Sequence, residues 1–386
     1  MGEWRECKLS DIIELIGGGT PKTTTPDYWD GDIPWLSITD FNNGRKFVSK
    51  TEKYITTAGL ENSSTKLLNT GDIIISARGT VGVIAVLVKP MTFNQSCYGV
   101  RAVDGMAYNN YIYYLLKDTV SSLQQIAHGG VFDTITRETF NNIDILLPPI
   151  PEQKAIAEVL SSLDDKVDLL HRQNKTLEAM AETLFRQWFV EFDFPGFTGE
   201  LVDGIPKGWL VLDLSSVSTL IAGGDKPTKY SIQQNELYKI PIYSNSITDE
   251  GLYGFTDLPR VYEESVTVSA RGTIGYVCLR VKPFVPIVRL ITVIPNQKYV
   301  SAKYIYLWLK NENISGTGTT QQQLTVPDFK KSKILVPHIE QVNQFTLIVN
   351  SIFDKIEHNI SQSRSLEKLR NTLLPKLMSG EVRVKL

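Results

Sequence analysis

The chain has 386 residues, and its 40 Lys and Arg against 42 Asp and Glu give a formal net charge of −2. This near-neutral balance excludes a uniformly basic nucleic-acid coat, but it does not exclude a local basic face. The three cysteines, Cys7, Cys97 and Cys278, are too widely spaced for a disulfide framework or a paired-cysteine metal site. No apolar run reaches the length of a membrane span, so we expect a soluble, cytoplasmic protein.

The chain contains an internal repeat. Three segments of the first half return in the same order in the second half: SARGTVG at Ser76–Gly82 and SARGTIG at Ser269–Gly275, ILLPPIPEQ at Ile145–Gln153 and ILVPHIEQ at Ile334–Gln341, and the glycine loops Gly17–Lys22 and Gly223–Pro227. The first two offsets are nearly equal (269 − 76 = 193 and 334 − 145 = 189). This regularity predicts two copies of one unit of about 190 residues.

The first part of each copy, residues 1–150 and 204–338, is expected to form a globular head. In both copies β-branched runs flank a short Arg-Gly turn, which predicts a hairpin. The paired runs are Asp72–Ser76 with Val81–Val88, and Ser265–Ser269 with Ile274–Val281. Short helices are expected near Asn110–Leu123 and Ala302–Leu309. Because Gly, Asn, Asp and Pro clusters separate these elements, each head is predicted to be a mixed α/β domain.

The second part of each copy has a helical pattern, from Glu152 to about Phe189 and from Glu340 to Met378. Apolar residues recur there at alternating steps of four and three. The predicted seam residues are Ile156, Leu160, Leu163, Val167, Leu170, Asn174, Leu177 and Leu184 in the first helix, and Phe345, Val349, Ile352, Ile356, Leu366, Leu373 and Leu377 in the second. A period of 3.5 over more than four heptads predicts a coiled coil.

The two helices are expected to pair with each other in antiparallel fashion, because a globular domain lies between them in the chain. Pairing with other chains is the alternative. Asn174, Asn359 and Ser363 would fix the register, and Arg370 would extend toward solvent near a helix end. A helix of about 38 residues is about 57 Å long.

The predicted fold class is therefore α+β, with two tandem domains separated and bridged by the helix pair and a pseudo-twofold repeat. The expected segments are the first head (1–150), the first helix with a connector (151–203), the second head (204–338) and the second helix with the C-terminal tail (339–386).

Several residues of the heads have side chains suited to nucleic acid. Arginine pairs with guanine or phosphate, hydroxyls contact either, and Asn and Gln amides fit adenine. The candidates are Thr20, Lys22, Ser76, Arg78, Thr80, Asn94, Gln95, Lys226, Asn245, Ser269, Arg271, Thr273 and Arg289, with Gln321–Gln323 as a weaker one. The second head also has 15 basic against 10 acidic residues, a net charge of +5. The structural alternatives are that Arg-Gly turns only close hairpins, glycine runs only form flexible loops, and turn amides only cap the backbone.

No catalytic or metal-binding motif stands out. The chain has no GxxxxGK[ST] phosphate loop and no HExxH pattern, and Pro148-Pro149 is followed by Ile150 where amino-methyltransferases have an aromatic residue. Pro26-Asp27 with Asp164-x-Lys166 formally matches a nuclease pattern. Asp164, however, flanks the helix seam, where such charges are usually solvated. We therefore predict a binding protein with no catalytic group and no metal.

An apolar stretch at the end of the first helix is typical of an exposed partner interface. Its aromatic residues are Phe185, Trp188, Phe189, Phe192 and Phe194.

Taken together, these features resemble the specificity subunit of type I DNA restriction–modification systems over nearly the whole chain. The matching motifs are Trp4-x4-Leu9-x-Asp11 with Gly17–Lys22, Gly31–Leu36, Gly71–Ile73 leading into SARGT, Leu147–Pro149 with Glu152–Lys154, Leu184-Phe185 with Trp188-Phe189, Phe192–Phe194, Pro206-x-Gly208-Trp209 and Leu373–Glu381. The second head departs from this pattern, because Gly223–Pro227 matches the first loop only loosely and a second Ile-Pro-Trp is missing. The two heads are therefore expected to read different sequences.

The resemblance implies that each head is a target-recognition domain for one half of a split site in double-stranded DNA. It also implies that the helix pair sets the unread spacer and docks two methyltransferase (modification) subunits. Those subunits would bind S-adenosylmethionine and methylate adenine, and separate motor-nuclease (restriction) subunits would cleave. The alternative is a two-headed scaffold that binds protein or glycan.

Overall fold

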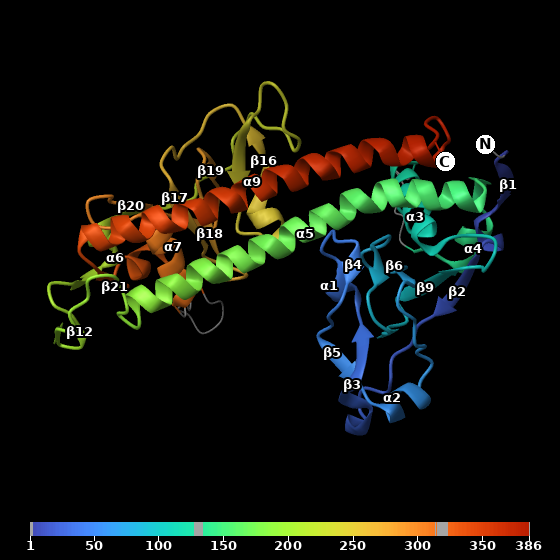
Figure 1. Ribbon diagram of the computed structural model, residues 1–386, viewed down its shortest axis with the longest axis horizontal. Coiled ribbons are helices and arrows are strands. Elements are labelled where there is room, and N and C mark those ends of the chain that lie inside the picture. The colour runs from blue at the N-terminus through green and yellow to red at the C-terminus, as the bar shows by residue number, and fades with distance from the viewer. Residues whose placement is uncertain (1–2, 127–133, 313, 315–322, 386) are drawn as a thin grey trace. The chain divides into compact units, whose positions relative to one another are not determined.

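Figure 1 shows the computed structural model, which describes residues 3–126, 134–312, 314 and 323–385. The chain forms two compact units. Unit 1 consists of residues 1–171 and 360–386, and unit 2 consists of residues 172–359. Each unit therefore contains one head and about half of each long helix, and the limits between the units fall within the helices.

The head of unit 1 is built on two main sheets. The five-stranded sheet has the order β2-β9-β6-β7-β4 and the three-stranded sheet the order β5-β3-β8, while β1 pairs with β10. The strands are β1 (Arg5–Lys8), β2 (Ile13–Gly17), β3 (Trp29–Leu36), β4 (Phe47–Val48), β5 (Lys53–Ile55), β6 (Ile73–Ser76), β7 (Ile84–Leu87), β8 (Thr92–Phe93), β9 (Cys97–Ala102) and β10 (Asp144–Leu147). The helices are α1 (Ile38–Phe41), α2 (Thr57–Glu61), α3 (Asn109–Ile126) and α4 (Arg137–Asn141), with short 3-10 turns at Leu9–Asp11 and Pro26–Tyr28.

Strand β6 shows why this sequence forms a central strand. Ile73 and Ile75 are buried in the cluster that contains the α3 residues Tyr111–Leu116, whereas Ile74 is buried in a second cluster with Leu36 and Phe93. Because side chains alternate between the two faces of a strand, an unbroken isoleucine run is stable only when both faces are covered. The head therefore has a core on each side of its five-stranded sheet.

The head of unit 2 repeats this plan. Its sheets have the orders β14-β20-β17-β18 and β16-β15-β19, and β13 pairs with β21 as β1 does with β10. The strands are β11 (Leu201–Val202), β12 (Ile205–Pro206), β13 (Leu210–Asp213), β14 (Ser218–Ala222), β15 (Ile240–Tyr243), β16 (Leu252–Thr256), β17 (Ser265–Ser269), β18 (Val277–Arg280), β19 (Val285–Pro286), β20 (Leu290–Pro295) and β21 (Lys333–Val336). The helices are α6 (Leu214–Val217), α7 (Ala302–Asn311) and α8 (Val326–Phe329), with a 3-10 turn at Thr248–Gly251. The repeat predicted from the sequence is confirmed.

The long helices are α5 (Ile150–Phe189) and α9 (Ile339–Met378), each of 40 residues. In unit 1 the carboxylate of Asp164 on α5 bonds to Arg370 on α9. In unit 2, farther along α5, Asn174 meets Asn359 and Phe185 meets Phe345. As the residue numbers on α5 increase from 164 to 185, those of their partners on α9 decrease from 370 to 345. The helices therefore pair within one chain in antiparallel fashion, as the fold prediction stated. All the predicted seam residues are buried or partly buried.

Two expectations about charged residues on the helices are wrong. Arg370 does not extend to solvent and Asp164 is not solvated: the two residues are 9% and 4% exposed, respectively. They form a buried ion pair, and Tyr114 on α3 also donates a hydrogen bond of 2.7 Å to Asp164. An unpaired charge in this position would be costly, so each residue is needed to keep the other buried. The burial also removes any basis for a nuclease role of Asp164.

The aromatic stretch at the end of α5 is not an exposed interface. Phe185, Trp188, Phe189 and Phe194 are at most 8% exposed and belong to the core of unit 2, and Phe192 packs against that core. The rings of Phe185, Trp188 and Phe189 all contact Phe345 on α9. The prediction of a partner interface is wrong because these residues lie where the helix pair meets the head of unit 2, and that head covers them.

Candidate nucleic-acid interface

The duplicated Ser-Ala-Arg-Gly-Thr segment forms an exposed turn in each head, between β6 and β7 and between β17 and β18. In unit 1 the turn is closed by a hydrogen bond of 2.9 Å from the Gly82 amide to the Ser76 carbonyl. The Ser76 side chain is fully buried, and its oxygen accepts a hydrogen bond of 2.8 Å from the Val83 amide. Arg78 and Thr80 are exposed at the tip. The buried serine thus shapes the turn, and the arginine and threonine are presented outward.

The turn of unit 2 is held by the same backbone bonds. The Gly275 amide donates to the Ser269 carbonyl over 3.0 Å, and Ser269 is fully buried. Thr273 is exposed at the tip, and Arg271 is partly exposed. The prediction that Ser76 and Ser269 contact DNA is therefore wrong, because both hydroxyls lie inside the head and are used within it.

Each turn is flanked by a second loop, which bonds to the alanine that precedes the arginine of the turn. The Ala77 amide donates to the Ser96 carbonyl (2.8 Å) in unit 1, and the Ala270 amide donates to the Arg289 carbonyl (2.9 Å) in unit 2. Arg289 is exposed and has a left-handed backbone (φ 73°). Asn94 is partly buried, and its side-chain oxygen Oδ1 accepts a hydrogen bond of 3.1 Å from the Ser96 backbone amide. Its amide therefore shapes this loop, as the structural alternative proposed.

The glycine loops are close-packed and not merely flexible. A Cβ atom on Gly18 would lie 2.1 Å from the Asn94 carbonyl oxygen, and one on Gly223 would lie 2.1 Å from the Ile287 carbonyl oxygen. Only glycine allows backbones to approach so closely. The loops are thereby held beside the Arg turns, where Lys22 is exposed and Thr20 donates a hydrogen bond to the exposed Gln95.

Lys226, in the second glycine loop, is exposed and lies against two tyrosines. Its ammonium group donates to the hydroxyls of Tyr230 (3.0 Å) and Tyr253 (3.3 Å) and lies 4.2 Å from the centre of the Tyr230 ring. These hydrogen bonds raise the pKa of Lys226 and lower that of Tyr230. Lys226 therefore stays charged at neutral pH, as binding to a phosphate requires.

Three further polar residues reach these surfaces, and the sequence did not mark two of them. Arg137 lies 5.9 Å from the Tyr98 ring and close to Gly17, and Arg260 lies beside Gly224. Gln323 accepts a hydrogen bond of 2.9 Å from Nε of Arg271. Residues 321 and 322 of the weaker candidate run lie outside the described residues. No local sequence motif predicts the positions of Arg137 and Arg260, because segments far away in the sequence bring them beside the glycine loops.

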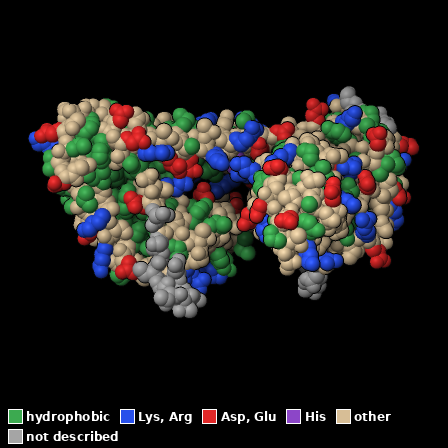
Figure 2. Space-filling model, turned by 90° about the horizontal axis from the view of Figure 1, so that it is seen from below, with side chains coloured by type: hydrophobic (Ala, Val, Ile, Leu, Met, Phe, Trp, Pro, Cys, Tyr) green, Lys and Arg blue, Asp and Glu red, His purple; other side chains and the backbone are tan. Residues whose placement is uncertain are grey.

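The surface of unit 1 that faces the viewer in Figure 2 carries a mixture of charges. Lys and Arg side chains are interspersed with Asp and Glu there. This face of unit 1 is therefore not uniformly basic.

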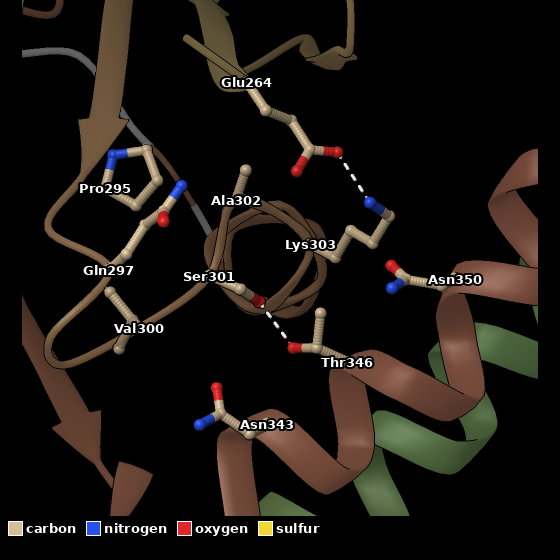
Figure 3. Close-up of a pocket in the computed structure, with 10 residues that line it drawn as sticks. All are labelled: Glu264, Pro295, Gln297, Val300, Ser301, Ala302, Lys303, Asn343, Thr346 and Asn350. Atoms are coloured by element: carbon tan, nitrogen blue, oxygen red, sulfur yellow. Dashed lines mark hydrogen bonds and ion pairs between the residues drawn. The ribbon is translucent and has the colours of Figure 1, made fainter.

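The cavity described in unit 2 lies away from the Arg turn, between α7 and α9 (Figure 3). Its volume is about 280 Å³. Lys303 pairs with Glu264 over 2.6 Å, and the hydroxyls of Ser301 and Thr346 are 2.8 Å apart. Its polar groups thus largely bind one another and join the head to the helix. Among the residues that the structure describes, no cluster of three His, Cys, Asp or Glu could hold a metal ion, and no helix could cross a membrane.

The comparisons with known proteins agree with one another. Residues 1–179 and 206–367 match the family model described as "Type I restriction modification DNA specificity domain". The chain is 30% identical to the type I restriction enzyme MjaIX specificity subunit of Methanocaldococcus jannaschii, over 99% of this chain and 94% of the relative. It is 25% identical to the HindI specificity subunit of Haemophilus influenzae, over 70% of this chain and 76% of the relative. A crystal structure of a type I S subunit from M. genitalium superposes with a TM-score of 0.56 at 15% identity, over 97% of this chain and 96% of that chain.

Proposed function

Because the chain belongs to the family of type I restriction–modification DNA specificity subunits, we propose that its two heads each read one half of a split site in double-stranded DNA. The observation that supports this most directly is the duplicated turn. In both heads the same backbone bonds present an arginine and a threonine beside a glycine loop that carries an exposed lysine, Lys22 or Lys226. Such side chains supply the phosphate and base-edge contacts of DNA readers.

The proposal divides the labour between this chain and its partners. This chain supplies recognition, two methyltransferase (modification) subunits bind S-adenosylmethionine and methylate adenine, and motor-nuclease (restriction) subunits cleave. The internal repeat supports two equivalent docking positions, because a duplicated chain offers the same surface twice. The substrate is intracellular DNA, in line with the cytoplasmic location expected from the sequence.

We further propose that the helix pair sets the length of the unread spacer. A 40-residue helix is about 60 Å long at 1.5 Å per residue, and the paired apolar seam makes it rigid. On this proposal, the length of the helix pair sets the separation at which the two heads meet DNA.

The spacer proposal is tested by lengthening both helices equally. Seven residues with the seam pattern are inserted after His171 and seven more after Asn359, at the two limits between units. The insertion adds about 10 Å and should lengthen the spacer by about three base pairs at 3.4 Å each. Methylation-site mapping of the assembled complex should show the longer spacer with both half-sites unchanged. Seven substitutions on the exposed side of the same segments, with no change in length, are the control.

DNA binding itself is tested by the salt dependence of duplex binding. A reader that neutralises phosphates loses affinity steeply as salt rises, whereas a scaffold for protein or glycan would not retain duplex DNA at all. An unchanged spacer after the paired insertion would reject the spacer proposal but leave DNA recognition intact.

A further inference from the structure

The equivalent arginines of the two turns are held differently. In unit 2 the carbonyl oxygen of Arg271 accepts hydrogen bonds from the Asn245 amide nitrogen (3.0 Å) and from the Ser269 hydroxyl (3.1 Å). Its side chain is fixed as well, because Nε donates to the Gln323 side-chain oxygen over 2.9 Å. Both the backbone and the guanidinium of Arg271 are thus constrained.

In unit 1 the places of Asn245 and Gln323 hold different residues, and the Ser76 hydroxyl donates to the Thr80 carbonyl instead. The place of Asn245, beside the glycine of the turn, is taken by Ile38: a Cβ on Gly79 would lie 3.8 Å from the Ile38 side chain, as one on Gly272 would lie 3.7 Å from the Asn245 amide. The place of Gln323 is taken by Thr134, which pairs with Arg78 through the backbone. Arg78 is exposed, and no side chain among the described residues is shown to hold its guanidinium.

The difference has a chemical consequence. With Nε bound to Gln323, no bond among the described residues uses the two terminal nitrogens of Arg271. They suit a ligand with two acceptors side by side, such as O6 and N7 of guanine. A side chain fixed before binding also loses less conformational entropy on binding. An arginine whose guanidinium is not held by another side chain can bind a phosphate in many orientations. It therefore adds affinity for DNA without selecting a base.

We propose that Arg271 reads a guanine in the second half-site, and that Gln323 and Asn245 are positioning residues that make this reading selective. Arg78 in the first head instead contributes mainly to affinity. The inference rests on the proposed function, since it needs the heads to bind DNA. It also assigns Asn245 a new role, because its amide nitrogen serves Arg271 and not, as the sequence suggested, an adenine.

The test uses the full chain assembled with its modification subunits and duplexes in which each position of both half-sites is varied in turn. Arg271→Ala should remove the preference for guanine at one position of the second half-site, a loss of roughly tenfold or more in discrimination. Gln323→Ala should weaken that preference severalfold at the same position, with little change at the others. Gln323→Glu keeps the acceptor oxygen and should restore the preference, which a merely structural role would not predict. Arg78→Ala should weaken methylation at all sequences alike and reduce the salt dependence.

The outcomes separate the two levels of the argument. If Arg271→Ala relaxes one position while Gln323→Ala matches the unmodified chain, the positioning role is wrong and DNA reading by the head stands. If Arg271→Ala lowers methylation equally at all sequences, Arg271 binds phosphate and the inference is overturned. If the unmodified complex methylates without sequence preference, the proposed function itself fails. Circular dichroism and assembly with the modification subunits check that each variant is folded.

Discussion

In unit 1 the interior of the helix pair contains a buried ion pair, here called the charged interior, whereas the equivalent positions in unit 2 are apolar and aromatic. Because α5 and α9 begin 189 residues apart (339 − 150) and are equally long, each position in one helix has an equivalent in the other. Asp164 and Arg370, which pair in unit 1, correspond to Phe353 and Ala181, which are buried in the core of unit 2. The same backbone arrangement is therefore stabilised in two different ways.

The charged interior also ties the first head to the helices. Lys46, which precedes β4, donates hydrogen bonds to Ser161 on α5 (2.8 Å) and to Tyr114 on α3 (3.2 Å). Tyr114 in turn donates to Asp164. At the junction in unit 2, Phe189 packs against both Tyr304 and Phe345, and Tyr306 on α7 donates a hydrogen bond to Glu178 on α5. Ring packing tolerates small shifts, whereas a buried ionic network requires every partner.

The largest effect is expected for Arg370→Ala. Removing one partner of a buried ion pair leaves the Asp164 carboxylate without compensation and should lower the free energy of unfolding of unit 1 by about 3–5 kcal/mol. Hydrogen exchange read by mass spectrometry measures this, because amides of α3 and of α7 report on units 1 and 2 separately.

The matched control removes both charges. Asp164→Leu combined with Arg370→Ala removes both members of the ion pair, and apolar replacements of buried ion pairs are often tolerated. We expect the double variant to regain at least half of the lost stability. A double variant as unstable as Arg370→Ala would show that the apolar stem of Arg370, and not its charge, stabilises unit 1.

A somewhat smaller effect is expected for Phe345→Ala in unit 2. The ring contacts Phe185, Trp188 and Phe189, and its loss should cost about 3 kcal/mol through lost burial and a cavity. The loss should be confined to the amides of unit 2 and should not depend on pH between 6 and 9. Equal loosening of α3 in unit 1 would show that the two interiors are not independent.

The sequence predicted what depends on period and repetition. A heptad pattern is local, so it predicts that Ile156 lies on the seam without knowledge of the rest of the fold. A repeated SARGT segment likewise predicts two equivalent turns. The interior of unit 1 was not predictable in this way, because Asp164 lies beside the seam and its burial results from α3, which packs over it. The prediction that the aromatic end of α5 is exposed is wrong for the same reason, because the head of unit 2 packs over it.

The candidate site also has features that local sequence predicts and features that depend on contacts between distant residues. The exposure of Arg78 at a glycine turn follows from local chemistry. The hydrogen bond between Arg271 and Gln323 does not, because the two residues are 52 positions apart in the chain. Only pairing between β strands and loops, such as the bond from the Leu324 amide to the Ala270 carbonyl, brings them together.

The smallest predicted effect concerns two equivalent lysines, Lys117 on α3 and Lys310 on α7. Burial, the larger cause, and the charge of Arg370 together lower the pKa of Lys117 to about 8, against the opposing effects of Asp164 and Glu367. Burial also acts on Lys310, but Glu178 and Glu182, at 3.3 Å and 3.4 Å, outweigh it and raise its pKa. The residue that corresponds to Arg370 in unit 2 is Ala181, so Lys310 has no cation there to oppose it.

The opposite directions give opposite pH dependences. Between pH 8 and 10.5 the native state has lost a proton from Lys117 that the unfolded chain still binds, so the free energy of unfolding rises with pH over this window. Lys117→Met should therefore stabilise unit 1 at pH 7, and the gain should shrink steadily toward pH 9.5. For Lys310 the native pKa lies above the unfolded one, so its contribution is fully present below pH 10.5 and is lost only at higher pH. Lys310→Met should accordingly destabilise unit 2 by the same amount at pH 7 and pH 9.5. Urea titrations monitored by hydrogen exchange at both pH values measure the change in the free energy of unfolding for each variant. A pH-independent effect of Lys117→Met would mean that Lys117 is solvated and that the charged interior of unit 1 does not extend to it.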